Sequence, residues 1–220
     1  MSDTIRTWGD LDQDGALEEA SAKLVGDDRA SFLRRAAFGG AAVVGAGSLM
    51  GLLPSIAEGA TPASDVAILN FALTLEYLEA AFYAEAKANA GIFVGDTRNF
   101  VSVVARHEAV HVAFLKKALG SAAVKKPTFN FKGTTQNQAK FQATAQVLED
   151  TGVTAYLGQV TNIKTPAILK AAGTIVTVEA RHAAWMRHIR MVAPAPLVFD
   201  TPKTKAQILT AVGKTGFITG

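Results

Sequence analysis

The chain has 220 residues, of which 49% are hydrophobic and 19% charged, a composition typical of a globular protein with one well-buried domain. Its 22 basic and 19 acidic residues leave a net charge of only +3. The basic pairs at 116–117 and 125–126 stand alone and form no continuous stripe, so we expect no nucleic-acid partner. Cysteine does not occur, which excludes disulfides, iron–sulfur clusters and thiol catalysis and leaves oxygen and imidazole nitrogen as metal ligands.

Residues 1–60 are expected to form a targeting segment that is separate from the folded domain. Arg29, Arg34 and Arg35 precede an uncharged, glycine-diluted run over 36–53, and small residues suited to cleavage follow at 55–57. This order resembles a twin-arginine signal, which implies export across the cytoplasmic membrane with the export machinery as a partner. Two alternatives stay open. The run could be an Ala/Gly-rich core helix, or it could be an uncleaved membrane anchor, because its length is near the lower limit for spanning a bilayer.

Apolar residues at helical spacing predict four long helices. The first is expected over 64–90, with Ser64 and Asp65 at its N-cap and Gly91 after its end. The second starts at 96 or 97 and stops at Gly120, and the third starts at 134 or 135. The fourth starts at 165–166, where Pro166 suits the first helical position, and runs until 193. The apolar positions of the third helix are Phe141, Ala145, Val147, Leu148, Val153, Tyr156 and Leu157.

The connections between these helices predict a bundle. Short links make helices one and two, and helices three and four, antiparallel hairpins. The link between helices two and three has about 13 residues, which at ~3.3 Å each can run the ~40 Å length of a helix, so these two helices can be parallel. We therefore expect an all-α four-helix bundle with a long crossover over residues 61–193. Residues 194–220 are expected to form a tail with one short helix that covers the bundle without chemistry of its own.

The two predicted hairpins repeat one pattern of polar residues. Each carries a glutamate, a tyrosine two turns later, and then the phrase Glu-Ala-x-His. The glutamate and histidine of that phrase are three residues apart and so share one face of a helix. The first hairpin supplies Glu76, Tyr83, Glu108 and His111, and the second supplies Glu149, Tyr156, Glu179 and His182. Four converging carboxylates would repel one another, and two divalent metal ions would offset their charge.

This arrangement resembles the ferritin-like di-iron carboxylate superfamily over residues 64–192. The stretches "LNFALTLEYLEAAFY" and "VEARHAAW" are further similar to bacterial ferritin-like domain proteins of the desiccation-related type. The resemblance implies two divalent ions that react with dioxygen or peroxide, and it favours iron over manganese as their identity. It also implies that Glu108 and Glu179 bridge the two ions. The implied metal ligands are Glu76, Glu108, His111, Glu149, Glu179 and His182.

Two interpretations stay open for several residues near the predicted metal ligands. Glu79 is either a seventh ligand or a solvated residue on the outer face of its helix. Tyr83 and Tyr156 either hydrogen-bond the ligand carboxylates or fill the core. His107 and His188 have no counterpart in the repeat, so we expect surface or hydrogen-bonded residues there and no further ligands.

Two functions follow from these expectations. The first is an exported redox metalloprotein, an oxidoreductase with ferroxidase-like chemistry if it holds iron and catalase-like chemistry if it holds manganese. The alternative is a structural or stress-protective bundle in which the metal only stabilises the fold. Association into a homodimer is left open.

Overall fold

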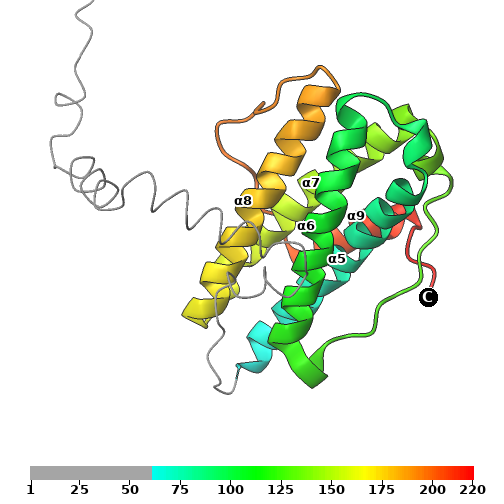
Figure 1. The fold of residues 1–220 in the computed structure, drawn as a ribbon. Helices are drawn as coiled ribbons and strands as arrows, with labels where there is room; N and C mark the ends of the chain where they lie inside the picture. Colours follow the sequence, from blue (N-terminus) through cyan, green and yellow to red (C-terminus); the bar gives the residue numbers. More distant parts are fainter. Residues whose placement is uncertain (1–60) are drawn as a thin grey trace, which may run out of the picture. The chain divides into compact units, whose positions relative to one another are not determined.

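The computed structural model describes residues 61–220, and these form a bundle of four long helices with a fifth, shorter one against it (Figure 1). The long helices are α5 (Ala63–Ala88), α6 (Asp96–Leu119), α7 (Gln138–Gln159) and α8 (Pro166–Ile189), and α9 spans Lys205–Thr215. The prediction of an all-α bundle is confirmed. The predicted export signal lies outside the described residues.

The four long helices form two hairpins joined by a crossover. A link over 89–95 joins α5 to α6, and a link over 160–165 joins α7 to α8; the closest packing in the bundle is within these two pairs. Residues 120–137 connect α6 to α7, and Figure 1 shows this segment running along the side of the bundle. The predicted crossover is therefore present, and it lets α6 and α7 run in the same direction.

Apolar side chains fill the bundle on both sides of its middle. One cluster includes the rings of Phe82, Phe100 and Phe141, and a second includes Leu115 and Ile168. Phe82 and Phe141 stack with their ring centroids 5.2 Å apart. The apolar helix α5 is long enough to cross a membrane and has a mean hydropathy of 1.3, yet 61% of that stretch is buried inside the bundle. Its apolar residues therefore belong to the core of the bundle.

The C-terminal tail is tied to the bundle through its backbone. The amide of Lys203 donates to the carbonyl of Thr154 on α7 at 3.0 Å. A Cβ at Gly158 would lie 1.8 Å from the Lys203 carbonyl oxygen, so only glycine lets the tail cross α7 so closely. Beyond α9, the amide of Thr128 in the crossover donates to the Gly220 carbonyl at 2.8 Å, which joins the tail to the crossover.

The start of α5 differs from the prediction. The helix begins at Ala63, after Pro62, and Asp65 lies inside its first turn as a fully buried residue. Its carboxylate accepts hydrogen bonds from the backbone amides of Lys164 at 3.1 Å and Thr165 at 2.8 Å. Asp65 therefore does not cap its own helix. It holds the backbone at the entrance to α8, so its acceptor serves a segment about 100 residues further along the chain.

Three other local predictions are corrected. Residues 134–136 form a 3-10 turn, and α7 starts later, with Asn137 as the N-cap whose side chain accepts from the Lys140 amide at 3.0 Å. Val147, predicted on the apolar side of this helix, is 57% exposed. The helices α5 and α8 end at Ala88 and Ile189, two to four residues before their predicted ends.

Candidate metal centre

Four helices bring six acidic and imidazole side chains together in the middle of the bundle. Helices α5 and α7 each supply one glutamate, and α6 and α8 each supply a glutamate and the histidine on the same face three residues later. Their exposed fractions lie between 0% and 8%. The six are the residues that the sequence predicts as ligands: Glu76, Glu108, His111, Glu149, Glu179 and His182. The structure brings all of them together, and their binding of a metal stays a prediction.

The cluster consists of two overlapping groups of four residues. In each group, one potential ligand atom from every residue lies within 4.8 Å of the others. Both groups contain Glu108 and Glu179. The first adds Glu76 and His111, and the second adds Glu149 and His182. An arrangement with two shared carboxylates is suited to two ions side by side.

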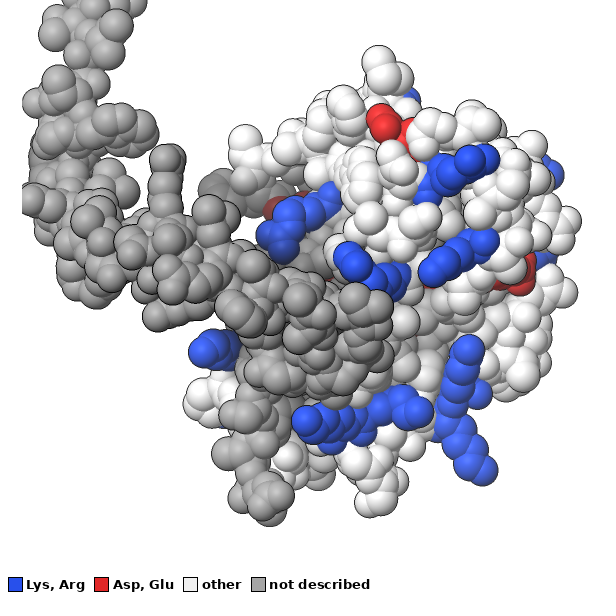
Figure 2. Space-filling model, in the orientation of Figure 1, with Lys and Arg blue, Asp and Glu red and all other residues white. Residues whose placement is uncertain are grey.

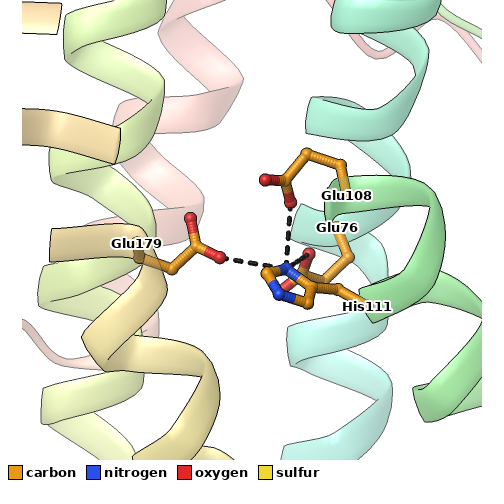
Figure 3. Close-up of side chains that lie close together, drawn as sticks. All are labelled: Glu76, Glu108, His111 and Glu179. Carbon is orange, nitrogen blue, oxygen red and sulfur yellow. Dashed lines mark hydrogen bonds and ion pairs between the residues drawn. The ribbon is translucent and has the colours of Figure 1, made fainter. Parts of the chain in front are cut away.

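The first group is arranged around one nitrogen of His111 (Figure 3). Nδ1 of this histidine lies 3.3 Å from Glu76 Oε2, 3.2 Å from Glu108 Oε2 and 3.0 Å from Glu179 Oε1. The three carboxylates come from α5, α6 and α8, so three different helices meet at this nitrogen (Figure 3).

The second group repeats this geometry around His182. Its Nδ1 lies 3.2 Å from Glu108 Oε1, 3.2 Å from Glu149 Oε2 and 3.6 Å from Glu179 Oε2. Glu108 and Glu179 therefore each direct one oxygen to one histidine and the other oxygen to the other histidine. This is the orientation that a bridging carboxylate needs.

Two tyrosines support the glutamates that are not shared. The hydroxyl of Tyr156 on α7 donates to Glu76 Oε1 on α5 at 2.6 Å, and the hydroxyl of Tyr83 on α5 donates to Glu149 Oε1 on α7. Each tyrosine thus orients the glutamate of the opposite hairpin. Of the two readings of these tyrosines, hydrogen bonding to the predicted ligands is the one that the structure shows.

Two further side chains reach the cluster from outside the predicted set. His107 Nδ1 lies 2.8 Å from Nε2 of His182, the nitrogen that faces away from the carboxylates. Glu79 is only 3% exposed, so its reading as a solvated outer-face residue is wrong. It belongs to neither group of four. His188 is exposed, as expected of a surface residue.

The hydrogen bonding of the cluster is incomplete without a cation. Four buried oxygens have no hydrogen-bond partner within residues 61–220: Glu76 Oε2, Glu108 Oε1, Glu179 Oε1 and Glu179 Oε2. A histidine N–H lies near several of them but can serve only one acceptor well. An unpaired buried carboxylate oxygen is costly, and a divalent cation among them satisfies several at once. The set of oxygen and imidazole donors therefore fits two divalent ions and suits iron or manganese.

Protons replace part of the missing positive charge in the metal-free protein. Burial by itself would lower the pKa of His182, but the hydrogen bonds with Glu108, Glu149 and Glu179 outweigh it and raise this pKa to about 12. Burial, the largest cause, raises the pKa of Glu76 to about 8, against the attraction of the nearby histidine. The metal-free centre therefore holds protons that ions would displace.

The burial of these carboxylates also changes the balance of charge on the protein surface. Glu79 and the four predicted ligand glutamates lie inside, which removes five acidic groups from the outside of the protein. Lysine and arginine side chains are accordingly more numerous than acidic ones on the face that Figure 2 shows.

The contact between His107 and His182 was not predicted from the sequence, and the burial of Glu79 was left open. Nothing in the local pattern around His107 indicates that it reaches His182 on another helix, because 75 residues separate them. Glu79 did leave a signal: its counterpart in the second hairpin is Gly152, and a Cβ there would lie 3.3 Å from Glu79 Oε1. A glycine opposite a glutamate in an internal repeat indicates space for a buried side chain.

Known proteins were compared with this chain. The model of the ferritin-like domain family matches residues 64–191, which is more than half of the chain and contains all four bundle helices except the first residue of α5. The chain therefore belongs to the ferritin-like domain family. A comparison with curated proteins gives no match.

Proposed function

We propose that the centre binds two divalent metal ions, with iron preferred over manganese, and that the loaded protein reacts with dioxygen or peroxide. The observation that carries the proposal is the pair of four-residue groups sharing Glu108 and Glu179, with four buried carboxylate oxygens that lack a hydrogen-bond partner within the described residues. Iron would supply ferroxidase-like or oxidase chemistry, and manganese catalase-like dismutation of peroxide.

The residues of the chain have separate tasks in this proposal. Glu76 with His111, and Glu149 with His182, each hold one ion, and the two shared glutamates hold both. Tyr83 and Tyr156 keep the unshared glutamates in place through their hydroxyl hydrogen bonds. The apolar clusters on both sides keep bulk water from the buried centre, which strengthens the electrostatic interactions inside it.

Metal content in single variants tests the binding. The metal-free full chain, reconstituted with Fe²⁺ without oxygen or with Mn²⁺, should hold close to two ions. His111→Ala should weaken one position more than the other, whereas Glu108→Ala should disturb both, because a bridge serves both ions. His188→Ala, which removes an exposed histidine, is the matched control and should leave metal content unchanged. If the folded wild-type protein binds no iron or manganese, or if the ligand variants bind as much as the control, the proposal fails.

Turnover separates the redox proposal from a structural or stress-protective role. A redox centre should consume dioxygen or peroxide repeatedly once loaded, and Glu108→Ala should abolish this consumption. A loaded protein whose melting temperature rises while it consumes neither oxidant would instead support metal binding for stability alone.

We also propose that the protein is exported through the pathway that reads paired arginines. The support is the order of Arg34 and Arg35, the uncharged run and the small residues that follow. Replacing both arginines with lysine should leave the protein in the cytoplasm, and the matched Arg6→Lys variant should be exported normally. Export of the double variant at the normal rate would remove this proposal and reopen the anchor and core-helix alternatives.

A further inference from the structure

The internal repeat allows the two halves of the centre to be compared position by position. Residues of α5 correspond to residues of α7 at the spacing that pairs Glu76 with Glu149 and Tyr83 with Tyr156. Residues of α6 correspond to those of α8 at the spacing that pairs Glu108 with Glu179 and His111 with His182. All predicted ligands and both supporting tyrosines have a counterpart of the same residue type. These paired residues alone would make two equivalent metal positions.

The first break in this symmetry is at His107. Its counterpart on α8 is Val178, which has no hydrogen-bonding side chain. The ring of His107 lies almost parallel to that of His182, with 18° between the ring planes, and its Nδ1 is 2.8 Å from Nε2 of His182. Nε2 of His111 has no such partner within residues 61–220. His182 is therefore contacted at both ring nitrogens, whereas His111 is contacted at Nδ1 alone within the described residues.

The contact with His107 acts on metal binding through the proton of His182. Nδ1 of His182 faces the carboxylates, and when it holds an ion the remaining ring proton is on Nε2, from which it can be donated to Nδ1 of His107 at 2.8 Å. This contact fixes the ring orientation, and in the ion-bound form it favours the proton on Nε2, with the Nδ1 lone pair directed at the ion. A histidine that donates its second nitrogen in this way is a stronger ligand than one without an outer partner.

The second break in symmetry is the pair of Glu79 and Gly152. The point where a side chain at Gly152 would begin lies 3.3 Å from Glu79 Oε1 and 3.7 Å from Glu179 Oε2. Oε2 of Glu179 is the oxygen that faces His182. Glu79 thus occupies space that glycine leaves free, on the side of the centre where His182 lies. The half that contains His182 has one more carboxylate beside it than the half that contains His111.

We propose that the two metal positions are unequal and that the position formed by Glu149 and His182 binds its ion first and more tightly. His107 is a positioning residue for this site, and Glu79 places one more buried carboxyl group beside it. The inference rests on the proposed function, since it needs a centre that binds two ions. The Glu76–His111 position, without an outer histidine or an added carboxylate, is filled second.

Equilibrium titration of the metal-free full chain with Mn²⁺ tests this order. The wild-type protein should bind in two resolved steps. His182→Ala should lose the tighter step, and His111→Ala should keep it and lose the weaker one. His107→Val copies the residue found at the corresponding position of the second half. It should weaken the tighter step by about 10–100-fold, the range for loss of an outer partner of a metal-bound histidine.

Two more variants distinguish positioning from a general effect on folding. Glu79→Gln keeps the shape of the side chain, replaces the carboxyl group with an amide that cannot ionise, and should also weaken only the tighter step. Val178→His gives the other half an outer histidine and should strengthen the weaker step, a gain that a purely structural role of position 178 would not produce. His188→Val is the control and should change neither step. Circular dichroism must show the wild-type helix content for each variant.

The outcomes separate this inference from the proposed function. Two ions bound with equal affinity, or loss of the tighter step in His111→Ala instead of His182→Ala, would overturn the unequal positions while leaving the two-ion centre intact. Unchanged binding in both His107→Val and Glu79→Gln would do the same. A folded wild-type chain that binds no Mn²⁺ and no Fe²⁺ would overturn both.

Discussion

The stability of the metal-free protein should fall as the pH rises from 6.5 to 8. Hydrogen bonds to the carboxylates overcome the effect of burial and raise the pKa of His182 from 6.5 to about 12, and burial raises that of Glu76 from 4.5 to about 8. In the folded chain His182 keeps its proton over this pH range and Glu76 loses its proton only near the upper end, whereas in the unfolded chain Glu76 is already ionised and His182 gives up its proton. A pKa that is raised by folding stabilises the protein fully below the unfolded value and loses this contribution as the pH approaches the folded value.

The two groups lose their contributions over overlapping ranges. For Glu76 the range runs from pH 4.5 to about 8, and for His182 from pH 6.5 to about 12, so both act between 6.5 and 8. One extra proton in the folded state changes the free energy of unfolding by about 1.4 kcal/mol per pH unit. The two groups together should lower it by on the order of 1–3 kcal/mol per unit, a large part of the ~5–15 kcal/mol that usually separates folded and unfolded domains.

Urea unfolding of the chelator-treated protein at several pH values measures this slope. His182→Asn removes one of the protons and should reduce the slope by on the order of 1 kcal/mol per pH unit. The loaded protein should behave differently, because ions bind deprotonated ligands, so its advantage in stability over the metal-free protein should widen with pH. A metal-free protein whose stability is constant or rises between pH 6.5 and 8 would refute the argument that the centre holds these protons.

Two further predictions concern side-chain contacts outside the set of ligands. Tyr156→Phe removes the donor to Glu76 and should weaken the ion at that position by about 10-fold or more, measured by metal titration; unchanged affinity would mean that the tyrosine only fills space. Gly158→Ala would place a methyl group 1.8 Å from the Lys203 carbonyl oxygen and should destabilise the protein by about 1–3 kcal/mol in urea unfolding. Gly173→Ala, with no atom within 4 Å of the new methyl group, should instead stabilise α8 by about 0.5–1 kcal/mol, and equal effects of the two alanines would contradict the proposed crossing of tail and helix.

Local spacing was sufficient to predict the bundle and the members of the cluster. Apolar periodicity predicts the four helices because one face of each must be buried, and the length of the crossover permits the direction of α7. The three-residue spacing places Glu108 beside His111 and Glu179 beside His182 on one helix face. The repetition of this phrase indicates a shared centre because two copies of a costly buried pattern are unlike random surface residues.

Contacts between helices were decided by the tertiary structure alone. Spacing along one helix fixes which side chains share a face, but the rotation and offset of neighbouring helices follow from how the apolar clusters pack. For this reason the sequence could not show that each tyrosine reaches the glutamate of the opposite hairpin, or that Asp65 serves the start of α8. For the same reason the outer bond from His182 to His107, and the burial of Glu79 against Gly152, emerged only once four helices were packed around one centre.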